Sequence, residues 1–349
     1  MTMAAGAGLL AAFPDARAWP EPAAGIPMQG HAWAAARWEL LPPGARRHLL
    51  AISDADEIHA AALLVRAGDW LREPPALFEP GDLHWRDEAS LQTLAHSLAS
   101  QPLPLLLERV PATSPTLAAL RQAYAGRGWL RVRPAMPTPF ITLAGRGSDC
   151  DAWFNAGRRA DFRRAERKAA GFGRLTYTLH APGDDAELPG LLGEAYGVET
   201  RSWKAAARSA LTTDPVQGAF FSRLAHALAR QGELRLAFLR LDGHPVAMQI
   251  ACIWQDRFWL FKISHDRAFD ACSPGQLLIR HSLGHAAANG LQSYEFLGLM
   301  APWTRLWTDT QREYQRIEAI PYTALAARMF LKRGLRSALT ALRGRRGAT

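Results

Sequence analysis

Four titratable side chains lie at or near the ends of two apolar runs in the second half of the chain. His265 and Asp266 end the run that begins at Phe258, and Tyr294 and Glu295 belong to the next run. A histidine or carboxylate can take a proton from an attacking amine or hydroxyl, and a tyrosine can give one to a leaving group. His265, Asp266 and Glu295 are therefore alternative candidate bases, and Tyr294 is a candidate acid.

The triplet Ser264-His265-Asp266 is not a hydrolase triad. Side chains alternate between the two faces of a strand, so Ser264 and Asp266 share one face, while Ile263 and His265 share the other. The three groups cannot meet in one hydrogen-bonded chain.

A short loop between the two apolar runs predicts an anion-binding helix start. Ser273 is suited to the helix cap and Pro274 to the first turn, and Gly290 supplies a stop. The first amides of such a helix have no partner within it, so they can face a pyrophosphate. The predicted anion-binding segment comprises Ser273, Pro274, Gly275, Gln276 and Leu277.

Further polar and aromatic residues are candidates for binding an acceptor. Trp203 and Lys204 precede a polar, alanine-rich stretch. Trp303 and Trp307 are four apart on an expected helix, where they either stack on a sugar or adenine or pack in the core. Lys262 and Arg305 are basic groups that either bind an acceptor or pair with the candidate carboxylates.

Composition limits the location of the protein. The 349 residues are 48% hydrophobic and contain no apolar run long enough to span a membrane. Three cysteines far apart in sequence argue against disulfides and zinc, and we expect no metal. The start of the chain lacks the basic residues of a signal peptide. These features favour a cytoplasmic protein in a reducing compartment, with Cys272 a packing residue rather than a nucleophile.

The net charge of +9 is concentrated in two segments. Residues 158–168 carry a net +4 and residues 328–346 a net +7, so the rest of the chain is slightly acidic. A general nucleic-acid surface is therefore not expected. Residues 158–168 either form a solvated helix face or bind a phosphorylated acceptor, a nucleotide sugar or RNA. The second predicts an amphipathic helix that docks on the protein or on anionic lipid at the inner face of the membrane.

Hydrophobic periodicity divides the chain into two α/β halves after a loose first segment, residues 1–30. In residues 31–145 it predicts strands at 48–53, 59–67, 103–110 and 138–143 and helices at 88–99 and 114–128. In residues 150–322 it predicts helices at 155–169, from 187, from 215 and at 274–289, and strands at 175–181, 234–241, 245–254, 258–266, 293–299 and 312–320. Asp242-Gly243 signals a hairpin turn. Residues 323–349 form the basic amphipathic helix and tail.

Several motifs in this order resemble the GNAT acyltransferase superfamily. They are NAGRRADFRRAERKA, SWK at Ser202 to Lys204, LRLAFLRLDGHPVAMQIA, FWLFKISHD followed by CSPGQLL, and YEFLG followed by WTRLWT. Within that superfamily the chain resembles the CelD/BcsL-type (cellulose-biosynthesis-associated) acetyltransferases, related in architecture to the Fem peptidyltransferases. This resemblance implies an α/β (α+β) chain of two tandem GNAT-like domains, with mixed, largely antiparallel sheets flanked by helices.

The resemblance also implies the reaction. An acyl-CoA donor, in the first instance acetyl-CoA, would acylate an amine or hydroxyl of a saccharide or cell-envelope (exopolysaccharide) precursor. Amides near Ile263 and Ser264 would polarise the thioester, and the N-terminal domain would help to form the acceptor cleft. The chain departs from the family in lacking the RxxGxG/A loop, and Thr304 holds a place where relatives often have lysine. The alternatives are a Fem-like transferase using aminoacyl-tRNA and a catalytically silent scaffold at a membrane-bound polysaccharide synthase.

Overall fold

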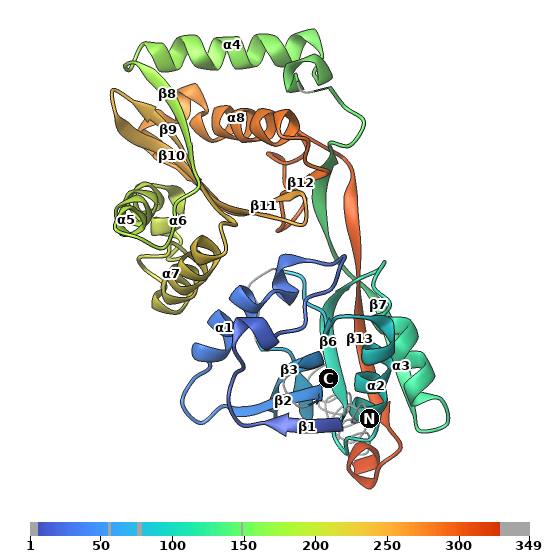
Figure 1. The fold of residues 1–349 in the computed structure, drawn as a ribbon. Helices are drawn as coiled ribbons and strands as arrows, with labels where there is room; N and C mark the ends of the chain where they lie inside the picture. Colours follow the sequence, from blue (N-terminus) through green and yellow to red (C-terminus); the bar gives the residue numbers. More distant parts are fainter. Residues whose placement is uncertain (1–5, 55–56, 75–78, 148, 329–349) are drawn as a thin grey trace, which may run out of the picture. The chain divides into compact units, whose positions relative to one another are not determined.

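The chain folds into two compact units. The computed structural model describes residues 6–54, 57–74, 79–147 and 149–328 (Figure 1). Unit 1 comprises Met1–Met136 and Glu313–Thr349, and unit 2 comprises Pro137–Arg312. The strands β7 (Gly128–Thr142) and β13 (Gln311–Pro321) each begin in one unit and end in the other.

Unit 1 is a mostly antiparallel sheet in the order β1-β2-β3-β4-β6-β13, with β5 paired to β3. Only the β4–β6 pair is parallel among the pairs described within this unit. Besides β13 and the start of β7, the strands of unit 1 are β1 (Gly6–Leu10), β2 (Arg46–Ser53), β3 (Ile58–Ala67), β4 (Trp70–Arg72), β5 (His84–Trp85) and β6 (Leu105–Pro111).

Helices cover both faces of this sheet because its strands are apolar on both sides. Leu50 and Ile52 of β2 pack with α2 (Glu88–Ala99) and α3 (Thr116–Tyr124). Leu49 and Ala51 point to the opposite face, where α1 (His31–Glu39) supplies Trp38. Successive side chains of β2 point to opposite faces of the sheet, so they pack in two separate cores.

Two parts of unit 1 differ from the expected boundaries. Residues 6–30, expected to be loose, contain β1 and the 3-10 turns η1 (Ala16–Ala18) and η2 (Pro27–Gln29), and they bury Trp19 and Met28. The Trp19 indole donates to the Gln29 carbonyl at 3.0 Å. The last strand, expected in the second domain, pairs with β6 of unit 1. These contacts join segments far apart in sequence, which local patterning does not reveal.

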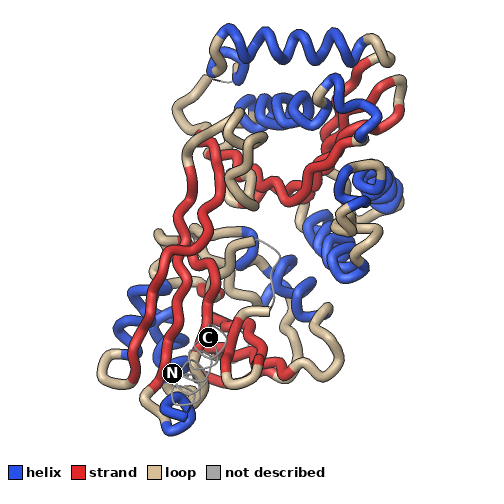
Figure 2. Tube along the Cα trace, turned by 180° about the vertical axis from the view of Figure 1, so that it is seen from behind, coloured by secondary structure: helices blue, strands red, loops and turns tan. Residues whose placement is uncertain are grey.

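Unit 2 has the strand order β7-β12-β11-β10-β9-β8, in which only β11–β12 is a parallel pair among the described pairs. Its strands are β8 (Leu175–His180), β9 (Leu234–Leu241), β10 (His244–Trp254), β11 (Arg257–His265) and β12 (Ser293–Glu295). Its helices are α4 (Ala156–Ala170), α5 (Glu187–Thr200), α6 (Trp203–Ala206), α7 (Pro215–Arg230) and α8 (Pro274–Ala288), with 3-10 turns η3 (Cys150–Trp153) and η4 (Arg267–Cys272). Within this unit, α4 and α8 lie on one side of the sheet and α5 to α7 on the other, as both views show (Figures 1 and 2).

Local sequence signals explain the starts and turns of these elements. Asp242 and Gly243 have φ of 47° and 84°, the left-handed conformation that a tight hairpin between β9 and β10 requires. Asp214 caps α7 by accepting from the amides of Val216 and Gln217. Asn155 caps α4 through the Arg158 amide at 2.8 Å. The predicted mixed α/β class with helix-flanked sheets is confirmed.

Two local expectations have other outcomes, and a third falls outside the described residues. The segment around Trp303 is a series of turns rather than a helix, held by Thr304, whose hydroxyl accepts from the Ala301 amide. The strand expected at 293–299 is only three residues long, Ser293–Glu295. The basic C-terminal helix lies outside the described residues beyond position 328. No helix in the described part of the chain is long and apolar enough to cross a membrane.

Candidate active site

The two central strands of unit 2 separate after a short parallel pairing. Arg257 to Trp259 of β11 pair with Ser293 to Glu295 of β12. β12 ends at Glu295, whereas β11 continues to His265, so the second half of β11 is not paired with β12 within the described residues. Unpaired strand edges offer backbone donors and acceptors to a ligand. The edge is therefore the place where an extended donor molecule can bind.

A β-bulge lies at the point where the strands separate. The register passes from Ile250 opposite Lys262 to Ala251 opposite Leu260, so Phe261 is an extra residue on β11. A bulge bends a strand and re-aims the side chains that follow it. Here the residues that follow are those expected to act on the donor.

His265 lies at the end of β11, beside the start of α8. Its Nε2 is 2.9 Å from Oδ1 of Asp270, in η4, and the imidazole is 32% exposed. A Cβ placed on Gly275 would be 3.2 Å from Nδ1 of His265, so this nitrogen faces the first turn of α8. Donation from Nε2 to Asp270 leaves Nδ1 as the acceptor nitrogen of the ring. The arrangement is that of an imidazole base oriented by a carboxylate.

The two candidate carboxylates are both held in ion pairs. Asp266 accepts from Nε of Arg201 at 2.6 Å and from the Ala268 amide at 3.0 Å. Glu295 is fully buried, where it accepts from Nη2 of Arg312 at 2.7 Å and from the Ser293 hydroxyl at 2.6 Å. Each carboxylate thereby accepts a charge-assisted hydrogen bond from an arginine.

Tyr294 is enclosed in the core of unit 2. Its ring stacks on Phe258 with centroids 4.7 Å apart. Its hydroxyl is 2.9 Å from the Ser282 hydroxyl and accepts from the Gln249 amide at 3.4 Å. Burial raises the pKa of Tyr294 well above its ordinary value. The phenol therefore stays protonated in this environment.

The start of α8 has an unusual first residue. Ser273 adopts φ 50° and ψ 53°, and its side chain makes no capping hydrogen bond. Its carbonyl accepts from the amides of Gln276 and Leu277 at 3.0 and 3.3 Å. Two of the three amides expected to face an anion are therefore occupied by the first turn itself. Pro274 and Gly275 are buried beneath this turn.

Ser264 and Ile263 offer different groups beside the separated strands. The Ser264 side chain is 5% exposed, and its hydroxyl has no hydrogen-bond partner among the described residues. The carbonyl of Ile263 accepts from Nζ of Lys204 at 2.8 Å. A buried hydroxyl without a partner is costly unless a bound molecule supplies one. The Ser264 hydroxyl is thus a buried polar group on the part of β11 that follows the separation from β12.

The expected acceptor residues of α6 and β11 lie in different surroundings. Nζ of Lys204 is 3.0 Å from Oε1 of Glu199. Glu199 is fully buried, and its Oε2 accepts from the Leu211 amide at 2.7 Å. Trp203 is 58% exposed. Lys262 donates to the side chain of Gln217 at 2.9 Å. Of these residues, Trp203 presents the largest apolar surface to solvent.

The aromatic pair near the end of unit 2 contributes to packing. Trp307 stacks on Phe162 of α4 with centroids 5.6 Å apart, and Arg158 lies over both rings. Trp303 meets Phe296 edge-on at 5.9 Å. Arg305 is exposed on the same series of turns. The structure thus brings His265 beside Gly275 at the start of α8, and it places Trp307 in the core.

Sequence reasoning missed the partners of these residues. Asp270, Arg201, Arg312 and Glu199 were not expected to contact the site. Asp270 follows His265 by five residues, and such proximity is the only signal that the sequence offered for the pair. The other partners come from separate elements.

Cysteine and metal chemistry have no support in the described residues. The Cys272 thiol is buried, and burial raises its pKa, which disfavours the thiolate that a nucleophile needs. No cluster of three or more histidine, cysteine or acidic side chains within the described ranges is arranged to hold a metal ion.

The fold of unit 2, with its separated central strands, is similar to that of GNAT-type domains. Residues 156–316 match the family model described as "Acetyltransferase (GNAT) domain". No curated protein matches the chain. The match covers the part of the chain that holds β11, β12 and α8.

Solved structures share the fold over most of the chain. The crystal structure of FemX is 12% identical, with a TM-score of 0.56 over 84% of this chain and 92% of that one. The C-terminal domain of a putative lysylphosphatidylglycerol synthetase from Agrobacterium fabrum is 13% identical, with a TM-score of 0.55 over 86% and 89%. A conserved protein of unknown function from Bacteroides thetaiotaomicron is 13% identical, with a TM-score of 0.54 over 84% and 90%. At these identities the likeness is one of fold.

Proposed function

We propose that unit 2 transfers an acyl group, in the first instance acetyl, from acyl-CoA to an amine or hydroxyl of a saccharide or cell-envelope precursor. The observation that carries this proposal is the oriented imidazole of His265 at the end of β11, where β11 and β12 have separated. The acetyltransferase (GNAT) match over residues 156–316 supports it. The sequence motifs favour an enzyme of the CelD/BcsL type.

The donor thioester binds along the open edge of β11 in this proposal. Backbone amides near Ile263 and Ser264 supply hydrogen bonds to it, and the first turn of α8 receives its phosphates. The helix N-terminus carries partial positive charge, which favours an anion even though two of its amides are internally bonded. Gly275 keeps the space beside His265 free of a side chain.

His265 acts as the general base through Nδ1. It accepts the proton of the acceptor amine or hydroxyl while that group forms a bond to the acyl carbon. The carbon–sulfur bond then breaks, and the leaving sulfur takes the proton held by the imidazolium and departs as the CoA thiol. Asp270 orients the imidazole and stabilises its positive charge, which is how a carboxylate assists a histidine base.

Exposed residues near α6 and the terminal turns are proposed to bind the acceptor. Trp203 offers an apolar face on which a sugar ring can stack, and Arg305 offers a charge for a phosphate. Lys204 is proposed to act from beneath this surface, by holding the Ile263 carbonyl in place.

Calorimetry with acetyl-CoA tests the proposal. Saturable binding is expected, with desulfo-CoA as a competitor. Gly275→Glu should abolish it, because the new carboxylate fills the space beside His265 and repels phosphate. Gly190→Glu is the matched control, since a Cβ at this exposed position of α5 meets no atom within 4 Å. Absence of binding by the folded wild-type protein would refute the donor assignment.

A second candidate is a Fem-like transferase that takes its acyl group from aminoacyl-tRNA. The specific observation in its favour is the exposed basic face of α4, with Arg163, Arg167 and Lys168, on a chain whose fold is similar to that of FemX. Filter binding of charged tRNA distinguishes the two candidates. Tight tRNA binding that Arg163→Glu and Arg167→Glu weaken, without acetyl-CoA binding, would replace the first proposal with the second.

A further inference from the structure

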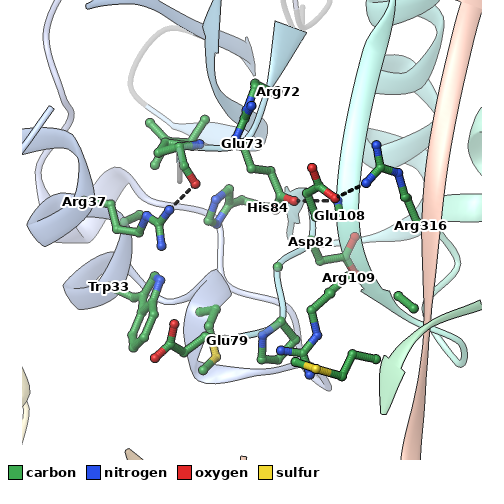
Figure 3. A pocket seen from close by; sticks show the side chains of 18 of the residues that line it. Trp33, Arg37, Arg72, Glu73, Glu79, Asp82, His84, Glu108, Arg109 and Arg316 are labelled. Carbon is green, nitrogen blue, oxygen red and sulfur yellow. Dashed lines mark hydrogen bonds and ion pairs between the residues drawn. The ribbon is translucent and has the colours of Figure 1, made fainter. Parts of the chain in front are cut away.

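Unit 1 contains a cavity that the proposed acyl transfer does not use. Its volume is about 430 Å3, within the usual range for small-molecule sites (Figure 3). Its walls come from α1, from residues 72–74 and 79–84 near β4 and β5, from β6, and from the unit 1 parts of β7 and β13. All of these residues belong to unit 1.

Arg109 of β6 is the exceptional side chain in this cavity. It is 8% exposed, yet Nε, Nη1 and Nη2 have no hydrogen-bond partner in the part of the chain that the structure describes. Figure 3 shows no interaction between Arg109 and any other side chain drawn. Its Cζ lies 5.1 Å from the ring centre of Tyr314, and the charge of Glu79 also acts on the guanidinium. Burying a charged guanidinium without hydrogen bonds is unfavourable, and an anion that accepts hydrogen bonds from it would offset this cost.

Two other arginines of the cavity are already engaged. Nη1 of Arg316 donates to Oε2 of Glu108 at 2.8 Å, and Arg37 donates to the Pro74 carbonyl. These bonds are marked by dashed lines in Figure 3. Arg109 is therefore available for a ligand in a way that Arg37 and Arg316 are not.

The acidic residues of the cavity limit how much negative charge a ligand can carry. Burial raises the pKa of Glu73 to about 7 and that of Asp82 to about 6. Asp82 accepts from the Thr116 hydroxyl at 2.6 Å, and Glu73 from the Glu108 amide at 3.3 Å. A phosphate dianion would add two charges beside Glu79 and Glu108, whereas a carboxylate adds one.

We propose that the cavity of unit 1 binds the carboxylate of a small organic acid, with Arg109 as its bidentate partner. The planar fork of a guanidinium matches the two oxygens of a carboxylate. Glu73, when protonated, can donate a hydrogen bond to the same ligand. This site is independent of the acyl donor, and its occupation requires no CoA.

Calorimetry on the full chain without CoA tests the site. The probes are D-glucuronate, L-lactate and L-alanine, with inorganic phosphate as the tetrahedral comparison. Saturable binding of at least one carboxylate, tighter than that of phosphate, is expected. If none of the three carboxylates binds, or if phosphate binds as tightly as the best of them, the proposal is overturned.

Arg109→Met separates ligand binding from structural support. Methionine keeps much of the side-chain volume, so the variant should fold, and the affinity for the carboxylate should fall about tenfold to a hundredfold. Without a probe, its melting temperature should rise above that of the wild type, because an unpaired buried charge has been removed. Arg121→Met, at an exposed position of α3, should change neither quantity.

Either of two results would overturn the role of Arg109. Unchanged affinity in Arg109→Met would show that another group binds the carboxylate. A lower melting temperature without a probe would show that the guanidinium supports the fold. Because all measurements omit CoA, they stand or fall separately from the acyl-transfer proposal.

Discussion

Each unit buries a cation, but in opposite surroundings. Lys204 in unit 2 has a buried carboxylate oxygen of Glu199 at 3.0 Å and the Ile263 carbonyl at 2.8 Å. Arg109 in unit 1 has neither a carboxylate nor a carbonyl within hydrogen-bond reach among the described residues. The two side chains are comparably enclosed, so burial does not explain the difference.

The comparison distinguishes two kinds of enclosed charge: one that is paired within the fold, as Lys204 is, and one that can bind a ligand, as is proposed for Arg109. A paired buried charge destabilises the protein when its partner is removed, whereas an unpaired one destabilises it while it remains. The candidate base of unit 2 follows a third pattern. His265 is paired through one nitrogen and faces the site with the other.

His265→Ala should produce the largest effect. Loss of a general base typically lowers a rate by about 100-fold to 10000-fold, so kcat should fall by this factor while acetyl-CoA still binds. Steady-state kinetics and calorimetry measure the two quantities. The matched control is His226→Ala, because His226 of α7 also pairs with an aspartate, Asp184, in unit 2. Equal losses in the two variants, or none in His265→Ala, would remove His265 from the chemistry.

Lys204→Met tests the paired side of the comparison. The substitution leaves Glu199 charged and fully buried without its cation, so the free energy of unfolding should fall by about 3 kcal/mol. Urea unfolding followed by circular dichroism measures the loss. The double variant Lys204→Met with Glu199→Gln should regain most of the stability, since no charge remains to be compensated. If Lys204→Met is as stable as the wild type, the contrast with Arg109 fails.

The buried Glu73 makes the stability of unit 1 depend on pH. Its pKa rises from 4.5 to about 7 on folding, mainly because of burial. The hydrogen bond from the Glu108 amide and the charge of Arg37 lower the pKa, whereas the negative charges of Asp82 and Glu108 raise it further. Because the pKa is raised on folding, the contribution of Glu73 to the free energy of unfolding is fully present below pH 4.5 and is lost as the pH rises through 7. The loss is at most about 3 kcal/mol.

Glu73→Gln should remove most of this dependence. The side chain keeps its shape but cannot ionise, so urea unfolding at pH 5 and pH 8 should differ less than in the wild type. Asp82, with a pKa raised to about 6, leaves a residual slope of the same sign. Glu57→Gln serves as a control at an exposed position of the same unit. A slope that the Glu73 substitution leaves intact would show that this group is already ionised at pH 5.

The sequence predicted the elements of the site better than its contacts. Helix α8, the β9–β10 hairpin and strand β11 lie where periodicity, proline and the Asp-Gly turn place them. These features depend on residues a few positions apart, which propensity can indicate. The pairing of β13 with β6 joins residues two hundred positions apart, and nothing local encodes it.

The candidate site shows the same limit. Asp266 and Glu295 were reasonable bases by residue type, but Arg201 and Arg312, each supplied by another element, decide how their charges are held. Ser273 was expected to cap α8 with its side chain, whereas its left-handed backbone brings the carbonyl onto the amides instead. The cavity of unit 1 had no sequence signal, because Arg109 is one charged residue next to Glu108 in an otherwise apolar strand.

Asp270→Asn should have the smallest effect on kcat among these variants. It tests how much the charge of Asp270 contributes to catalysis by His265. An asparagine can still meet Nε2 of the imidazole, but it carries no charge to stabilise the imidazolium that forms during the reaction. Since charge-assisted hydrogen bonds are about twice as strong as neutral ones, kcat should fall about tenfold. The Michaelis constant for acetyl-CoA and the melting temperature should not change, because Asp270 is exposed and touches no donor in this proposal. Asp270→Glu should recover part of the rate. A variant that loses stability with its activity would instead place Asp270 among the charges that hold the fold, like Glu199.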